Sequence, residues 1–458
     1  MLGFATVLIF AVALGCLLIG RGRAISVAGG DLSNLHSRPS YHGMLAALWA
    51  GIAGLATLLA MSQIWGGLNE SRLLTEIGNM APDLSAIERE LVLADARSIA
   101  DGNIASRIDD LRTAIADLYA KLNATRLWVT LIAAPLAAVL AGYLMISRIA
   151  PEWRARNRSE ALIRWVLWLC AAIAVLTTIG IVFSLIFETL SFFAALDWRM
   201  DKFLFGTTWS PLSGVHDGVM DPEKVGAIPL FVGTLLITLI AMIVAVPIGL
   251  LAAIYLSDFA SARVRAWAKP MLEILAGIPT VVYGFFAAIT VAPLIRGMGE
   301  GIGLSVASES ALAAGIVMGI MIIPFISSLS DDVINAVPQS LRDGSYGLGA
   351  TKAETIRQVV LPAALPGIVS AILLGVSRAV GETMIVVMAA GQGANLTVNP
   401  LEAVTTVTVQ IVMLITGDTE AETAAGPAFT LGFTLFCVTL LLNIVALRVV
   451  RKYREMYD

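Results

Sequence analysis

The stretch from Leu341 to Ile368 reads LRDGSYGLGATKAETIRQVVLPAALPGI and lies between two long apolar segments. Gly349 separates two short pieces of helical composition, and Pro362 and Pro366 are predicted to end the second piece before the next apolar segment begins. A polar but structured loop between two membrane spans is typical of a surface on which a soluble protein docks. The stretch therefore predicts a membrane protein with a structured cytoplasmic loop at 330–366.

The composition around this loop is that of a polytopic membrane protein. Hydrophobic residues make up 58% of the 458 residues and charged residues 14%, against about 45–50% and about 25% in soluble domains. A spanning helix needs about 20 predominantly apolar residues. Nine segments meet this requirement, at about 1–20, 44–65, 127–147, 165–187, 228–256, 271–295, 309–329, 367–391 and 428–447. The segment 400–416 is also apolar but short, and is predicted to be an interfacial or re-entrant element on the outer side.

The distribution of lysine and arginine predicts the orientation, because cytoplasmic loops carry an excess of both. With the N-terminus outside and the C-terminus inside, the loops assigned to the cytoplasm hold 18 of the 30 basic residues, and the basic tail Arg448–Arg454 lies inside. Counting 400–416 as a tenth span would place that tail outside. Arg21 and Arg23 follow the first segment and no small-residue cleavage site is evident, so this segment is expected to be an anchor.

A charged stretch at 66–126, between the second and third segments, has apolar residues spaced alternately by three and four. This spacing is typical of helices that pack side by side, and Asp101, Gly102 and Asn103 are turn formers. We expect an antiparallel helical hairpin outside the membrane, within an N-terminal module of three spans at 1–160. A structural stalk and a receptor that binds a solute both fit this pattern. The apolar positions are Leu84, Ile87, Leu91, Ala94, Ile104, Ile108, Leu111, Ile115, Leu118 and Leu122.

The cytoplasmic loop resembles the coupling loop of ABC importer permeases, whose pattern is Glu-Ala-Ala, three residues, Gly, nine residues, Ile, one residue, Leu-Pro. The spacing is kept throughout, but Asp replaces Glu, Gly-Ser replaces Ala-Ala and Val replaces Ile. Glycine weakens the first short helix, because it costs about 1 kcal/mol relative to alanine. The resemblance implies ATPase coupling through Asp343, Gly344, Ser345, Gly349, Lys352, Glu354, Val359, Leu361 and Pro362.

Two further stretches narrow the resemblance. LAGIPTVVYGFF at 275–286 and SRAVGETMIVVMAA at 377–390, taken with the loop, are similar to the PstC-type permease subunit of bacterial phosphate ABC importers. The similarity covers about 165–455 and implies a six-helix permease core at 161–458. It also implies three partners: a second, PstA-type permease subunit, a dimer of ATP-binding subunits, and an extracytoplasmic phosphate-binding protein.

Moving phosphate through hydrocarbon requires a compensating cation and polar walls. Arg378 and Glu382 are charged residues within an apolar segment, where a charge costs about 2.5–3.5 kcal/mol, and a four-residue separation predicts that they share one helical face. They are candidates for the substrate pathway, or alternatively an ion pair that only locks helix packing. Thr383 and Tyr283 offer hydroxyl groups, and Pro279 interrupts the sixth segment, either as an ordinary kink or as part of a gate.

Several signatures are missing from the sequence. It has no GxxxxGK[ST] loop, so we expect no ATP site in this chain, no cofactor of its own, and energy supplied by a partner that uses ATP. Metal and nucleic-acid signatures are also missing, and His36 and His42 are expected to be solvated. We therefore expect a non-enzymatic permease subunit of a phosphate importer in the bacterial inner membrane. A permease for molybdate or sulfate, and a membrane sensor that uses the outer hairpin, are the alternatives.

Overall fold

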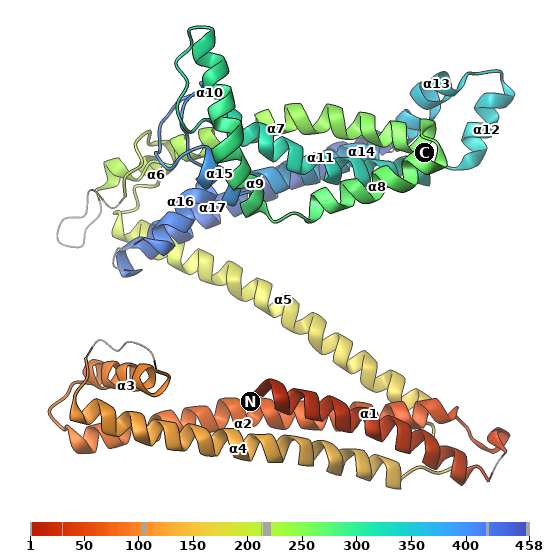
Figure 1. Ribbon diagram of the computed structural model, residues 1–458, viewed down its shortest axis with the longest axis vertical. Coiled ribbons are helices and arrows are strands. Elements are labelled where there is room, and N and C mark those ends of the chain that lie inside the picture. The colour runs from red at the N-terminus through yellow and green to blue at the C-terminus, as the bar shows by residue number, and fades with distance from the viewer. Residues whose placement is uncertain are drawn as a thin grey trace. The chain divides into compact units, whose positions relative to one another are not determined.

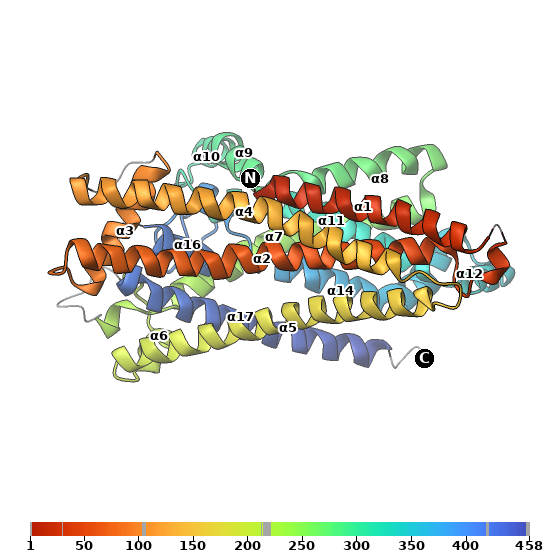
Figure 2. The same ribbon diagram turned by 90° about the horizontal axis from the view of Figure 1, so that it is seen from below.

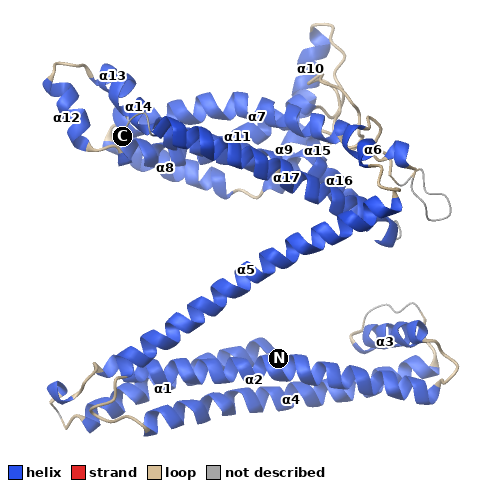
Figure 3. Ribbon diagram, turned by 180° about the vertical axis from the view of Figure 1, so that it is seen from behind, coloured by secondary structure: helices blue, strands red, loops and turns tan. Residues whose placement is uncertain are grey.

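The computed structural model describes residues 2–29, 31–102, 107–211, 213, 221–417 and 421–454. Within these ranges the regular elements are helices, with no strand (Figures 1 and 3). Nine of the described helices are long and apolar enough to cross a membrane, which confirms the predicted all-helical class and number of spans. The chain divides into two compact units, Met1–Val175 and Leu176–Asp458.

The N-terminal unit is built on three long helices, α1 (Leu2–Val27), α2 (Pro39–Met80) and α4 (Asp110–Ser147), which run side by side (Figures 1 and 2). Their contacts depend on small residues. A Cβ atom on Gly43 would collide with the backbone of Leu17, and one on Gly142 would collide with the sulfur of Cys16. Helices in lipid associate through such close contacts, because lipid chains are as apolar as leucine and provide no hydrophobic drive.

The predicted hairpin is present, but it packs differently from the prediction. Helix α3 (Ala86–Ala100) begins after Ser85, which forms a capping box with Glu88. This start sets the phase of α3, so that Ile87 and Leu91 are 81% and 52% exposed, and the predicted inward positions are wrong there. The residues that pack instead come from α3, α4 and the upper part of α2: Leu73, Ile77, Val92, Leu93, Ala96 and Ile115 are buried. The hairpin is therefore part of a three-helix assembly.

The apolar positions predicted on the second helix of the hairpin are partly confirmed. Leu111, Ile115, Leu118 and Leu122 of α4 all pack in the same cluster. Ile108 is 72% exposed and precedes the first turn of α4, because Asp109 caps that helix by accepting from the Arg112 amide. Asn103 and Ile104, predicted as a turn residue and a seam residue, lie outside the described residues.

Helix α5 (Ala155–Ala195) contains the boundary between the two units, and the second unit is centred on α11 (Ala311–Ala336). In the most apolar window of α11, 61% of the residues are buried, the largest share among the described spans. Its main neighbours are α7 (Ile228–Ile254) and α14 (Leu361–Val380). The other named elements are α6 (Met200–Phe205), α8 (Ala262–Gly277), α9 (Thr280–Phe286), α10 (Ala292–Gly301), α12 (Gln339–Gly347), α13 (Lys352–Thr355), α15 (Met384–Ala389), α16 (Val407–Thr416) and α17 (Ala421–Arg454).

Two predicted span boundaries and one helix end were wrong. The segment predicted at 271–295 is broken, since α8 ends at Gly277 and the span itself runs over Thr280–Gly301. The segment predicted at 367–391 stops at Val380, and α15 is a separate short helix. Pro362 and Pro366 do not end a helix but lie within α14. A π turn at Ile356–Val360 precedes Pro362 and widens the helix, which absorbs the mismatch that proline causes.

Candidate substrate path and coupling surface

The candidate substrate path lies where two helix breaks meet. One break separates α8 from α9 at Ile278 and Pro279, and the other separates α14 from α15 at Gly381–Thr383. The two breaks are connected through α9, because a Cβ atom on Gly284 of α9 would lie 2.9 Å from the carbonyl oxygen of Met384, the first residue of α15. Glycine at this point lets the two backbones approach closely.

Arg378 and Glu382 do not form the ion pair that their spacing allowed. Helix α14 ends at Val380, so Glu382 lies beyond the helix and the prediction of a shared helical face was wrong. The guanidinium of Arg378 lies over the ring of Phe325 on α11, 5.8 Å from its centre. Among the described residues no carboxylate lies within 4.0 Å of it, and the side chain is exposed within this single chain. Its charge is therefore available to an anion.

Glu382 is buried and acts as a cap. Its carboxylate accepts from the backbone amides of Met384 and Ile385, at 3.2 and 3.5 Å. Its own carbonyl oxygen accepts from the Thr408 hydroxyl of α16 at 3.0 Å. Glu382 therefore holds the start of α15 against α16. Sequence reasoning did not single out Thr408, although the threonine-rich composition of 400–416 was visible.

The other predicted path residues have distinct positions. Tyr283 is 7% exposed, and its hydroxyl donates to the carbonyl oxygen of Leu275 at 2.9 Å, which ties α8 to α9 across their break. Pro279 is exposed and immediately precedes α9, with φ −57° and ψ 137°. Thr383 precedes α15, half-buried, and its hydroxyl is 3.5 Å from the carbonyl oxygen of Gly381. The structure thus brings the five predicted residues to the two breaks.

The predicted coupling residues form a compact turn of two helices. Gly349 follows α12 with φ +86°, a conformation that glycine adopts without strain. The Ser345 hydroxyl lies 2.9 Å from that of Thr355, which joins α12 to α13. Thr351 and Glu354 form a capping box at the start of α13. The predicted glycine and serine positions are therefore structural elements of the turn.

Two basic residues anchor this turn to the membrane helices. Arg342 forms an ion pair with Asp258, in the π turn that ends α7, and donates to the carbonyl oxygen of Ile334 near the end of α11 at 2.9 Å. The amine of Lys352 lies over the Phe259 ring at 5.4 Å. Arg342 entered the sequence argument only as a cytoplasmic charge, since the distant Asp258 gave no local signal.

The remaining coupling residues divide into exposed and packed groups. Asp343 accepts from the Gln339 amide at 3.0 Å, and Gly344 has open space where a Cβ atom would lie. Val359 and Pro362 are half-buried, and Leu361 packs against the lower ends of α7 and α11. Among the large apolar residues that the structure describes, the most exposed is Leu348, 92% exposed at the tip of the turn. It was missed because its position only becomes prominent once the turn is folded.

A polar cluster next to α8 continues this connection. Asp331 of α11 is 4% exposed at its side chain and accepts from Lys269 at 2.8 Å and from Arg265 at 3.3 Å. This hydrogen bond raises the pKa of the Lys269 amine. The same cluster borders a cavity of about 190 Å³ that Phe325 also lines. The cluster thus links α8 to the helix that carries the ring beneath Arg378.

The histidines differ from the prediction in one case. His36 is exposed, as expected. His42 is 1% exposed, and its ring lies 6.1 Å from that of Trp153, so the prediction that it is solvated was wrong. The reason is that α2 begins at Pro39, earlier than the apolar run suggested, and includes His42 in the helical bundle. His216 lies outside the described residues.

Comparison with known families gives matches over both units. Residues 6–177 match a family described as phosphate ATP-binding cassette transporter, and residues 245–455 match a family described as binding-protein-dependent transport system inner membrane component. The N-terminal unit, which the resemblance at 165–455 did not cover, thus has its own match.

Curated relatives match the second part of the chain. The phosphate transport system permease protein PstC of Mesorhizobium japonicum is 32% identical over 296 residues, which cover 60% of this chain and 85% of that protein. PstC 1 of Mycobacterium bovis is 33% identical, over 65% of this chain and 94% of that protein. The probable ABC transporter permease protein YqgH of Bacillus subtilis is 31% identical, over 64% and 92%.

Solved structures give a more distant likeness. The MetNI methionine ABC transporter in an inward facing conformation is 20% identical, with a TM-score of 0.37, over 50% of this chain and 94% of that one. A bacterial ABC transporter involved in the import of alginate is 15% identical, with a TM-score of 0.42, over 62% and 96%.

Proposed function

This chain belongs to the PstC family of phosphate transport permeases, and from this membership we propose that Arg378 and the two helix breaks line its half of the phosphate path. The chain is a multi-pass inner membrane protein and a permease subunit of a phosphate importer. Membership in an ABC family implies ATPase and substrate-binding partners. The second half of the path comes from a PstA-type permease, and the captured anion comes from an extracytoplasmic phosphate-binding protein.

The observation that carries the proposal is the free guanidinium of Arg378. It rests on the Phe325 ring without a carboxylate partner among the described residues, at the end of α14 where the backbone departs from a helix. A guanidinium offers several donors in a fixed plane, which suits the oxygens of phosphate. Its charge compensates part of the cost of bringing a dianion into the membrane. The carboxylate of Glu382 is held by the amides of Met384 and Ile385 and does not pair with the guanidinium, so the two charges do not cancel.

Coupling to the ATPase takes place at the α12–α13 turn. The exposed Leu348 fits an apolar recess of the ATPase, and Asp343, Lys352 and Glu354 are exposed charged residues of the same turn. ATP hydrolysis belongs to that partner, and no cofactor is assigned to this chain. Movement of the turn is transmitted to α7 and α11 by Arg342, because this side chain contacts both.

Movement of α11 reaches the path, because Phe325 of α11 supports Arg378. The guanidinium then shifts relative to the break at Gly381–Thr383, and the path opens alternately to the two sides of the membrane. In this scheme the N-terminus lies outside and the α12–α13 turn lies in the cytoplasm, as the basic residues predict.

Reconstitution tests this proposal. The complex of this chain with its second permease, ATPase and binding protein is placed in proteoliposomes, and uptake of ³²P-labelled phosphate is measured with ATP inside. We expect uptake that unlabelled phosphate abolishes and that sulfate and molybdate leave unchanged. Competition by sulfate or molybdate instead of phosphate would assign a different oxyanion, and ATP hydrolysis by the purified chain alone would contradict a separate motor.

A further inference from the structure

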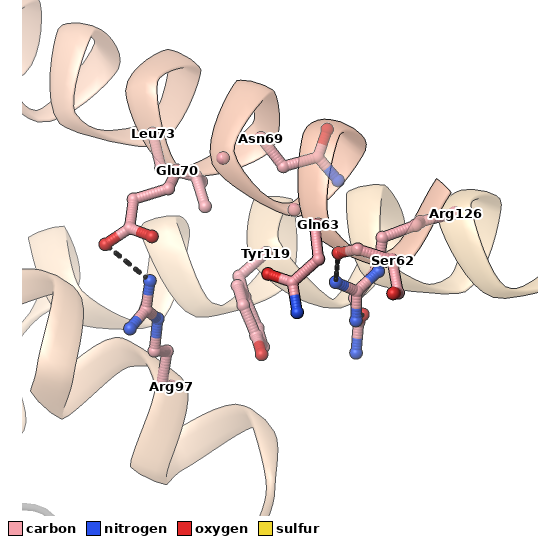
Figure 4. A pocket seen from close by; sticks show the side chains of 11 residues that line it. Ser62, Gln63, Asn69, Glu70, Leu73, Arg97, Tyr119 and Arg126 are labelled. Atoms are coloured by element: carbon pink, nitrogen blue, oxygen red, sulfur yellow. Dashed lines mark hydrogen bonds and ion pairs between the residues drawn. The ribbon is translucent and has the colours of Figure 1, made fainter. Parts of the chain in front are cut away.

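The N-terminal unit contains a polar pocket that the transport scheme does not use (Figure 4). It has a volume of about 400 Å³ and lies among α2, α3 and α4. Its position along these helices is defined by the sequence. Ser62 and Gln63 stand near the end of the apolar run of α2, and Arg126 stands just before that of α4. The pocket is therefore at the level where the hydrocarbon part of the unit ends.

The walls of the pocket are built for an anion. Two guanidinium groups face it from different helices, Arg97 from α3 and Arg126 from α4, with Gln63 and Tyr119 between them (Figure 4). Arg97 is paired with Glu70 at 3.0 Å, so the net charge at the pocket comes from Arg126. The lining residues are Ser62, Gln63, Gly66, Gly67, Asn69, Glu70, Leu73, Arg97, Tyr119, Asn123 and Arg126.

Arg126 is held in place by neutral groups alone. Its guanidinium donates to the Asn123 side-chain oxygen at 2.8 Å and to the Ser62 carbonyl oxygen at 3.4 Å. In the described part of the chain no carboxylate lies within salt-bridge distance of it. A guanidinium has five N–H donors, so several remain for a ligand. A positioned arginine with unused donors is the usual means of binding phosphate oxygens.

Two glycines keep the pocket open. Gly66 and Gly67 follow Gln63 within α2, where each costs about 1 kcal/mol relative to alanine. A Cβ atom on Gly66 would lie 3.0 Å from a terminal nitrogen of Arg126. A Cβ atom on Gly67 would meet nothing within 4 Å. The helix thus gives up side chains at the place where the guanidinium approaches it, which leaves room for both the guanidinium and its ligand.

We propose that this pocket binds a phosphate-bearing anion, with Arg126 as the main contact. The pocket shares no residue with the proposed transport path, because all its lining residues belong to the N-terminal unit. Two sources share the required chemistry: the headgroup of an anionic phospholipid, which lies at the same level as the pocket, and free inorganic phosphate.

The test uses the membrane complex of this chain with its second permease and ATPase, purified in a detergent without phosphate groups and in phosphate-free buffer. One sample is transferred to nanodiscs of phosphatidylglycerol and then examined by native mass spectrometry for retained lipid. A second sample, without binding protein, is examined for binding of ³²P-labelled inorganic phosphate. Each measurement compares the wild type with Arg126→Gln and Arg126→Lys. Arg72→Gln is the matched control, because Arg72 is an exposed arginine of α2 that does not line the pocket.

We expect Arg126→Gln to lower the affinity for one of the two ligands by about tenfold or more, because a charged hydrogen bond is lost. Arg126→Lys should retain part of the binding, and Arg72→Gln should match the wild type. Loss of lipid alone identifies the headgroup, and loss of labelled phosphate alone identifies the free anion. If Arg126→Gln binds both as the wild type does, while melting at the same temperature, the proposal is overturned. Gly66→Ala should displace the guanidinium and weaken binding, whereas Gly67→Ala leaves the guanidinium in place.

Discussion

At the scale of single residues, Arg378 is the side chain that best fits an anion on the substrate path. Its guanidinium is supported by an aromatic ring and faces no carboxylate within 4.0 Å in the described ranges. A positive charge within an apolar span costs free energy, so such residues usually have a function. The sequence singled out this residue as a candidate for the substrate path, but it suggested a partner, Glu382, that the helix end removes.

We predict that Arg378→Gln lowers phosphate uptake by at least about tenfold, since one charge-assisted contact to the anion is lost. Arg378→Lys keeps the charge but lacks the planar donors, so its uptake should lie between those of the wild type and Arg378→Gln. Uptake of labelled phosphate and phosphate-stimulated ATP hydrolysis are measured in the same proteoliposomes. Transport at the wild-type rate in Arg378→Gln would exclude a role on the path.

Gly344 and Gly349 form a matched pair in the coupling turn. Alanine at Gly344 enters open space within α12 and should stabilise that helix by about 1 kcal/mol. Alanine at Gly349 must adopt φ +86°, which should cost about 1–2 kcal/mol. Amide hydrogen exchange over 339–355 should therefore slow in Gly344→Ala and accelerate in Gly349→Ala. Equal exchange in both variants would show that the turn is not set by backbone conformation.

At the scale of elements, the structure depends on links between helices that are distant in sequence. The ion pair of Arg342 with Asp258 joins α12 to the end of α7, and both side chains are almost buried, at 11% and 7% exposure. Removing one partner of such a pair leaves an uncompensated charge. These links determine whether the turn moves with the membrane helices or independently of them.

We predict that Asp258→Asn uncouples ATP hydrolysis from uptake. The coupling turn should still bind the ATPase through its exposed residues, but its movement should no longer reach α7. The ratio of phosphate transported to ATP hydrolysed is the measurement, and it should fall severalfold while the ATPase still co-purifies. Asp332→Asn is the control, because Asp332 is 66% exposed on α11 and contributes only a weak contact at 3.8 Å. An unchanged ratio in Asp258→Asn would contradict the proposed link.

The stability of helix α4 should depend on pH through Asp109. The backbone amide of Arg112 donates to this carboxylate and lowers the pKa of Asp109. A lowered folded-state pKa contributes stability that is present above the ordinary value of about 3.9 and is lost as the pH falls through the folded value. The melting temperature of the N-terminal unit should therefore decrease as the pH is lowered from about 4, and Asp109→Asn should flatten this dependence. Asp83→Asn, at an exposed turn residue, should retain it.

At the scale of the whole molecule, the sequence predicted the number of spans but not where they break. The composition fixes nine apolar runs, since each needs only length and hydropathy. The breaks at 278–279 and 381–383 depend on tertiary partners: the Tyr283 hydroxyl across one, and Thr408 at the other. The burial of His42 depends in the same way on Trp153, which lies in the segment between α4 and α5. Local patterns carry no information about such distant partners. The phase of α3, in contrast, is set by the local Ser85–Glu88 cap, which the apolar spacing alone does not take into account.

The orientation yields a prediction for the complete chain in its membrane. Asp83→Cys should react with a membrane-impermeant maleimide added from outside, and Leu348→Cys should react only after the membrane is opened, because the two positions are predicted on opposite sides. Both side chains are exposed within the chain. Labelling is scored in a variant that lacks Cys16, Cys170 and Cys437. The reverse pattern would place the coupling turn outside and contradict the scheme.

The close contact of α1 with α2 and α4 has a consequence for how the N-terminal unit comes apart. Where Gly43 meets the backbone of Leu17 and Gly142 meets Cys16, no lipid chain or detergent tail can enter between the helices. Pulling one helix away exposes small-residue surface on the other two at once, so the three should separate together rather than one by one. Mechanical unfolding from the N-terminus should then give a single force peak for this bundle.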